Sequence, residues 1–124
     1  MKIVTDGAAN LTPERAKELG VTVVPFQDTF RGQPEDLYRM YIEYPEDFCE
    51  TSQPSVGDLK TVYEDFADED ILSIHLSSGL SGAYSSAEHA TRMLERENIA
   101  VVDSRTVGPA LGWMVETAAR GAKL

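Results

Sequence analysis

Residues 71–82 join an apolar run to a turn rich in hydroxyls and glycine, a pattern suited to binding an anion. Residues 71–76, Ile-Leu-Ser-Ile-His-Leu, have the character of a buried strand, and residues 77–82, Ser-Ser-Gly-Leu-Ser-Gly, open into a helix. Amide groups at the start of a helix have no partner within it and lie at the positive end of its dipole. Glycine lets a ligand approach this backbone closely, and serine adds hydroxyl donors. The pattern favours a carboxylate or phosphate site; the alternative is an ordinary strand-to-helix connection with serine caps.

The charge of the chain restricts which anion and which partner it can bind. Eleven Lys and Arg residues against 21 Asp and Glu residues give a formal net charge of −10 at pH 7. This excess opposes a nucleic-acid backbone or an anionic membrane surface as the main partner, so we expect no nucleic-acid binding. The turn has neither the Gly-x-Gly-x-x-Gly pattern nor the P-loop pattern, and no lysine lies beside it. A singly charged carboxylate, held by hydroxyls and amides, therefore fits better than a polyphosphate.

Catalytic and metal sites are the chemical alternatives to simple anion binding. A nucleophile elbow reads Gly-x-Ser-x-Gly, whereas residues 79–82 read Gly-Leu-Ser-Gly. We interpret His75 as a structural imidazole within its strand and His89 as a solvated side chain. Asp6 and Asp103 each end a strand and are expected to accept backbone N–H groups in their own turns, because two carboxylates without a third ligand form a weak metal site. The sequence therefore predicts neither an enzyme nor a metal site, and no cofactor.

The elements that position the turn alternate along the chain, which predicts a three-layer α/β/α fold with a mostly parallel sheet. The expected strands are residues 2–5, 21–26, 71–76 and 98–102. The expected helices are residues 13–20, 34–44, 56–66, 83–94 and 107–122. Thr12 and Ser55 have the types and positions of helix caps, and residues 50–55 are interpreted as a turn. The polar turns follow strands, and ligands bind at the carboxyl edge of open parallel sheets.

Length and composition indicate one domain. The 124 residues, 42% hydrophobic and 26% charged, are typical of a globular domain with its own core. Cys49 is the only cysteine, which excludes a disulfide within the chain. No apolar stretch has the length of a signal peptide or of a membrane span, so we expect a cytoplasmic protein without an integral membrane segment. We expect the last helix to present an apolar side made of Leu111, Met114, Val115, Ala118 and Ala119.

Two serine-rich motifs together resemble the DegV family of bacterial fatty-acid-binding proteins. The first is Thr-Ser-Gln-Pro-Ser at residues 51–55, and the second is Ser-Ile-His-Leu-Ser-Ser-Gly-Leu-Ser-Gly-Ala-Tyr at residues 73–84. Residues 21–26 and 101–104 match further segments of the family. The resemblance covers essentially the whole chain. It corresponds to the amino-terminal domain of family members alone, so we expect a single DegV-type domain over residues 1–124 and no second domain in this chain.

The resemblance implies that the protein binds a long-chain fatty acid and carries or presents it, with a fatty-acid kinase as an expected partner. It assigns ligand binding to Thr51, Ser52, Ser77, Ser78, Gly79 and Ser81. Of these, Thr51 and Ser81 would contact the carboxylate, and the others would shape the pocket around it. One domain would leave much of the acyl chain exposed unless a second copy or a separate second domain covers it. We therefore expect either a homodimer or weak lipid affinity.

The alternative is a truncated or paralogous DegV-like domain that binds no lipid and acts by protein interaction. The first turn of the family usually reads Asp-Ser-Thr-Ala-Asp, whereas residues 6–10 here read Asp-Gly-Ala-Ala-Asn. Two hydroxyls and one carboxylate are missing from this turn. The segment before the expected helix at residues 34–44 is also shorter than is usual in the family.

Overall fold

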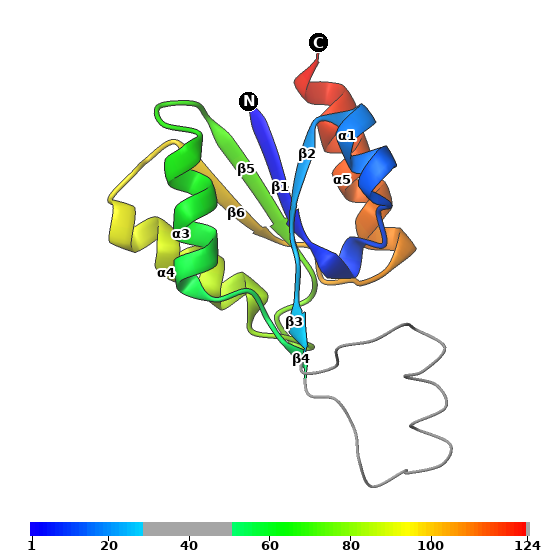
Figure 1. Ribbon diagram of the computed structural model, residues 1–124, viewed down its shortest axis with the longest axis horizontal. Coiled ribbons are helices and arrows are strands. Elements are labelled where there is room, and N and C mark those ends of the chain that lie inside the picture. Colours follow the sequence, from blue (N-terminus) through cyan, green and yellow to red (C-terminus); the bar gives the residue numbers. More distant parts are fainter. Residues whose placement is uncertain (29–50, 124) are drawn as a thin grey trace, which may run out of the picture.

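Four parallel strands form the central sheet in the order β2-β1-β5-β6 (Figure 1). The computed structural model describes residues 1–28 and 51–123, and the expected helix over residues 34–44 lies outside these ranges. The strands are β1 (Lys2–Asp6), β2 (Val21–Val24), β5 (Ile71–His75) and β6 (Ile99–Asp103). Because all four run in the same direction, their carboxyl ends meet at one edge, which brings the predicted polar turns together.

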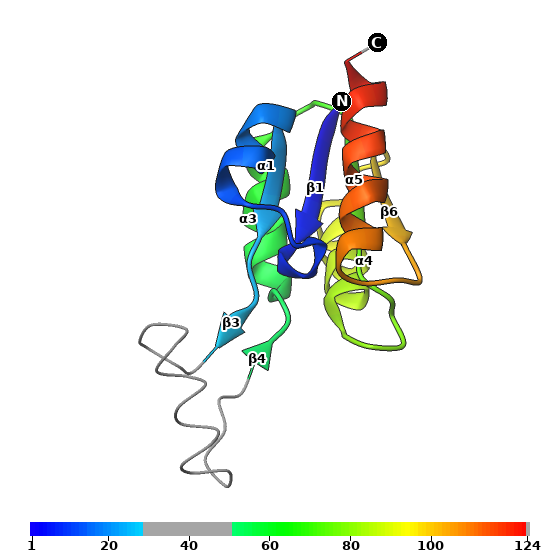
Figure 2. The ribbon, with the colours of Figure 1, turned by 90° about the vertical axis from the view of Figure 1, so that its right-hand side faces the viewer.

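In the described part of the chain, two helices cover each face of the sheet, which confirms the predicted three-layer α/β fold. On one face lie α1 (Pro13–Leu19) and α5 (Pro109–Ala122). On the other lie α3 (Val56–Asp65) and α4 (Ala83–Leu94). Figure 2 shows the pair α1 and α5 nearest the viewer, with β6 beyond α5 at the edge of the sheet. Among the described residues, no helix is long and apolar enough to cross a membrane.

Both predicted helix caps are confirmed. The Thr12 hydroxyl accepts a hydrogen bond from the amide of Arg15 at 3.1 Å, and Pro13 follows it in the first turn of α1. The Ser55 hydroxyl accepts from the amide of Asp58 at 3.0 Å, while the Asp58 carboxylate accepts from the amide of Ser55 at 3.3 Å. This reciprocal pair is a capping box, and it fixes where α3 begins after the first serine-rich motif.

The helix faces that pack on the sheet agree with the predicted apolar patterns except at one position. In α4, Ala83, Ala87 and Ala90 are fully buried, because small side chains let the helix approach the sheet closely. In α5, Met114 was expected on the same apolar side as Leu111 and Val115, which are buried, but it is 40% exposed. Among the described residues, no other helix covers the flank of α5 on which Met114 lies.

A short antiparallel pair lies beyond the carboxyl edge of the main sheet. β3 (Gln27–Asp28) pairs with β4 (Thr51–Ser52), with Gln27 opposite Ser52 and Asp28 opposite Thr51. The interpretation of residues 50–55 as a turn was therefore wrong for Thr51 and Ser52. Two-residue strands are too short to show the alternation by which strands are recognised in a sequence. The pairing fixes the backbone of the first serine-rich motif beside the edge where a ligand is expected.

Candidate functional site

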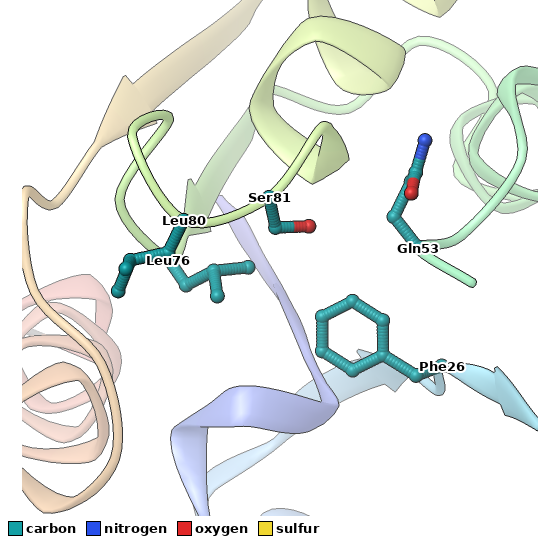
Figure 3. A pocket seen from close by; sticks show the side chains of 5 residues that line it. All are labelled: Phe26, Gln53, Leu76, Leu80 and Ser81. Carbon is teal, nitrogen blue, oxygen red and sulfur yellow. The ribbon is translucent and has the colours of Figure 1, made fainter. Parts of the chain in front are cut away.

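A cavity of about 310 Å³ lies at the carboxyl edge of the sheet, where the two serine-rich motifs meet. It is lined by Phe26, Gln53, Leu76, Leu80 and Ser81. Figure 3 shows the Ser81 hydroxyl pointing into the space between Leu76, Phe26 and Gln53. The lining combines one hydroxyl and one amide with three apolar side chains. Such a cavity suits a ligand that has a small polar group attached to an apolar body.

Gln53 joins the first motif to the second. A Cβ atom placed on Gly82 would lie only 2.8 Å from Nε2 of Gln53, so the Gln53 amide lies directly against the backbone of the turn. Gln53 is the residue next to β4, and Gly82 follows Ser81. The two motifs therefore meet at this point, where Gly82 leaves room for the end of the Gln53 side chain.

The turn between β5 and α4 is held by its own backbone. The carbonyl oxygen of Ser77 accepts from the amides of Leu80 at 2.9 Å and Ser81 at 3.2 Å, and its hydroxyl accepts from the amide of Gly79 at 3.2 Å. The amide of Ser77 donates to the carbonyl oxygen of Thr106 at 2.9 Å, which ties the turn to the segment after β6. Ser81 is thereby presented on a fixed loop at the start of a helix.

The Ser81 hydroxyl lies at the amino terminus of α4. Its oxygen accepts from the amide of Ala83 at 3.2 Å, which leaves the hydroxyl proton available to a ligand. No side chain of the described residues caps the helix at Gly82. A negative group placed beside Ser81 would therefore meet both a hydroxyl donor and the positive end of the helix dipole.

Ser78 is engaged outside the cavity. Its hydroxyl donates to Oδ2 of Asp103 at 2.6 Å, and its amide donates to Oδ1 at 3.2 Å. The amide of Arg105 also donates to Oδ1 of Asp103, at 3.0 Å. These bonds, that of the Ser78 hydroxyl first, lower the pKa of the Asp103 carboxyl below its ordinary value. Asp103 does accept a backbone N–H group in its own turn, as predicted, and it also links the two turns at the sheet edge.

The structure places the six predicted site residues in three ways. Ser81 lines the cavity, whereas Ser77, Ser78 and Gly79 form the turn that leads to it. Thr51 and Ser52 lie in β4, in the backbone segment that ends beside Gln53. The remaining lining residues were not predicted as site residues: Phe26, Gln53, Leu76 and Leu80. The sequence did indicate three of them, because Gln53 belongs to the first serine-rich motif and Leu76 and Leu80 belong to the second.

A buried chain of four polar side chains holds the ends of β1 and β5 together. The Tyr63 hydroxyl donates to Oγ of Ser73 at 2.7 Å, and Ser73 Oγ lies 2.7 Å from Nε2 of His75. Nδ1 of His75 lies 3.0 Å from Oδ2 of Asp6. Ser73 Oγ therefore contacts both Tyr63 and His75, and the opposite ring nitrogen of His75 pairs with Asp6. The interpretation of His75 as a structural imidazole is confirmed.

Ser73, His75 and Asp6 follow one another as in a catalytic triad, but no substrate can reach them. Ser73, His75 and Asp6 are all 0% exposed, so no substrate reaches the serine oxygen. Oδ2 of Asp6 also accepts from the amide of Leu76 at 3.1 Å, and Oδ1 accepts from Ala8 at 2.9 Å, as predicted for this turn. This set of buried hydrogen bonds therefore positions Leu76, which lines the cavity.

Within residues 1–28 and 51–123, no group of three His, Cys, Asp or Glu side chains could hold a metal ion.

Comparison with known proteins places the chain in a family. A family model described as an uncharacterised protein of the DegV family matches residues 1–123. A DegV domain-containing 15.5 kDa protein of Staphylococcus aureus is 37% identical over 123 residues, which cover 92% of this chain and 87% of that protein.

Two solved structures share the fold over nearly the whole chain. A DegV family protein from Thermus thermophilus, described as fatty acid binding, superposes with a TM-score of 0.83 at 31% identity, over 98% of this chain and 47% of that one. DegV from Bacillus subtilis, described as a fatty acid binding protein, gives a TM-score of 0.83 at 30% identity, again over 98% and 47%. The chain thus spans most of the staphylococcal relative and about half of each of these two structures.

Proposed function

This chain belongs to the DegV family, and we propose that it binds a long-chain fatty acid whose carboxylate lies beside Ser81. The observation that carries the proposal is the meeting of both serine-rich motifs at one cavity, with the Ser81 hydroxyl pointing into it (Figure 3). Thr51 is the proposed second hydroxyl, since β4 ends beside Gln53, which lines the same cavity. Ser52, Ser77, Ser78 and Gly79 would shape the loops around the head group.

The chemistry of the lining supports an amphipathic ligand. Phe26, Leu76 and Leu80 offer apolar surface beside the hydroxyl, and burial of methylene groups there would supply affinity at about 0.8 kcal/mol each. Hydrogen bonds to the carboxylate would mainly fix its orientation. The volume of about 310 Å³ is small for a long acyl chain, so the outer part of the chain would need a second cover.

The proposal makes the protein a carrier or presenter and assigns no bond-making step to it. Ser73, His75 and Asp6, whose order resembles a triad, are buried in a structural chain. A ligand whose tail emerges from the cavity could be passed to another protein, and a fatty-acid kinase stays the expected recipient.

The test is a comparison of fatty-acid binding by the parent protein and by Ser81→Ala. Fatty acid retained by the purified protein is identified by mass spectrometry, and the affinity for oleate is measured by calorimetry. We expect binding to weaken about tenfold in Ser81→Ala, because a hydrogen bond to a charged group is lost. Thr51→Val should weaken it similarly. Ser85→Ala is the matched control, since Ser85 is exposed one turn further along α4.

Two outcomes would contradict the proposal in different ways. If Ser81→Ala and Thr51→Val bind oleate as tightly as the parent, the head group is held elsewhere. If the parent binds no fatty acid, the lipid function is wrong, and a DegV-like domain that acts by protein interaction takes its place.

A further inference from the structure

Among the described residues, the side-chain amide of Gln53 lies at the cavity and has no hydrogen-bond partner. Gln53 is exposed, and it is the residue through which the first serine-rich motif lines the cavity. Phe26, Leu76 and Leu80 offer no polar side-chain group to a ligand. In the described lining, Gln53 is therefore the second polar side chain, beside Ser81.

The amide of Gln53 lies against the turn that carries Ser81. A Cβ atom on Gly82 would lie 2.8 Å from Nε2 and 3.2 Å from Cδ of Gln53, so this side chain ends beside the residue that follows Ser81. Figure 3 shows the Ser81 hydroxyl directed toward the side of the cavity on which Gln53 lies. The Ser81 oxygen accepts from the amide of Ala83, which leaves the hydroxyl proton for a ligand. A hydroxyl donor and an amide donor from different motifs therefore border the same space.

The backbone of Gln53 is held on both sides. The preceding residues form β4, which pairs with β3, and the following residue, Pro54, is fully buried. The capping box of Ser55 and Asp58 then starts α3. Because the backbone is already ordered, only the side chain of Gln53 has to be ordered when a ligand binds, which lowers the entropic cost of the contact.

We propose that Gln53 is a further head-group ligand, whose Nε2 donates to one carboxylate oxygen of the fatty acid while the Ser81 hydroxyl donates to the other. This inference rests on the proposed function and names a residue that selects a charged head group. Each carboxylate oxygen can accept more than one hydrogen bond, so Gln53 and Thr51 do not exclude each other. None of the described lining residues is positively charged, so this part of the site relies on neutral donors such as the Gln53 amide.

The test compares oleate with oleyl alcohol in two near-isosteric variants of Gln53. Gln53→Met keeps the length of the side chain and removes the donor, so the affinity for oleate should fall about tenfold. Gln53→Glu keeps the shape and places a negative charge beside the head group, so oleate should bind about a hundredfold more weakly. The affinity for oleyl alcohol should change by less than about threefold in both variants, because its hydroxyl is neutral and can donate to a carboxylate.

Gly82→Ala tests the contact between the two motifs independently. The backbone φ of −84° at Gly82 suits alanine, but the added Cβ would displace the end of the Gln53 side chain. We expect Gly82→Ala to weaken oleate binding several-fold in the parent protein. In Gln53→Met the same substitution should have little further effect, because the amide that it displaces is already absent.

Ser85→Glu is the matched control for the added charge, since Ser85 is exposed on α4, and oleate affinity should stay within about twofold of the parent. Circular dichroism confirms that all variants are folded. If both Gln53 variants bind oleate as the parent does while Ser81→Ala weakens binding, this inference is wrong and the proposed function stands. Equal losses for oleate and oleyl alcohol would also overturn it, because Gln53 would then only shape the cavity. If the parent binds no oleate, the proposed function is wrong and this inference falls with it.

Discussion

At the scale of single residues, the chain from Tyr63 to Asp6 links the core to the cavity. Burial raises the pKa of Tyr63 to about 12, although the hydrogen bond with Ser73 opposes this rise. The phenol therefore stays protonated over the ordinary range of pH and keeps donating to Ser73. Ser73 lies against His75, and His75 pairs with the Asp6 carboxylate, which also accepts from the amide of Leu76.

Tyr63→Phe should make stability respond differently to alkaline pH. Below pH 10, the parent should be more stable by about 1 kcal/mol, because the variant lacks the hydrogen bond with Ser73. Between pH 10 and 12 the unfolded phenol loses its proton while the folded one keeps it, so the parent loses stability as the pH rises, by roughly 2 kcal/mol at most. Urea unfolding of both proteins at a series of pH values should show the gap between them closing at about pH 11 and reversing above it, because the loss exceeds the initial difference. A gap that stays constant would mean that Tyr63 ionises no differently in the folded protein.

At the scale of elements, α5 owes its position to a glycine. A Cβ atom on Gly112 would lie 2.5 Å from the carbonyl oxygen of Ala9, in the short helix η1 (Gly7–Ala9) that follows β1. The amide of Gly108 also donates to the carbonyl oxygen of Ala8 at 2.8 Å. The turn that departs from the family pattern at residues 6–10 thus serves as a packing surface for α5.

Two alanine substitutions in α5 should therefore have opposite effects on stability. Gly112→Ala should lower the free energy of unfolding by about 1–3 kcal/mol, because backbone atoms cannot move aside easily. Gly121→Ala meets no atom within 4 Å and should raise it by about 0.5–1 kcal/mol, since alanine favours the helix. Thermal or urea unfolding measures both. Equal effects of the two substitutions would show that η1 does not constrain α5.

Features that depend on neighbours in the sequence could be predicted from it, whereas contacts between distant segments could not. The caps at Thr12 and Ser55 depend on neighbours three residues away, and both were found. The pairing of His75 with Asp6 joins residues 69 positions apart, and no local pattern indicates it. Gln53 against Gly82 is likewise a contact between distant segments. Periodicity placed Met114 on an apolar face, but it cannot say whether the fold covers that face.

At the scale of the whole molecule, a strongly acidic protein is proposed to bind an anion. The net charge is −10, and neither Lys nor Arg is among the described residues that line the cavity. From the described part of the chain, the carboxylate of a fatty acid would therefore be attracted by local donors, the Ser81 hydroxyl and the start of α4, against a repulsive overall field. This balance has a measurable consequence, because salt screens the long-range repulsion and affects the short hydrogen bonds much less.

Raising the salt concentration should therefore strengthen the binding of oleate, by about threefold between low and physiological ionic strength. The control is oleyl alcohol, which has the same chain without the charge and reports the salt effect on apolar burial alone. The quantity to compare is the ratio of the two affinities, measured by displacement of a fluorescent fatty acid, and we expect it to rise with salt. A ratio that falls with salt would mean that a cationic side chain contacts the head group. In that case the cation would come from outside the lining seen here, and Ser81 would not be the principal contact.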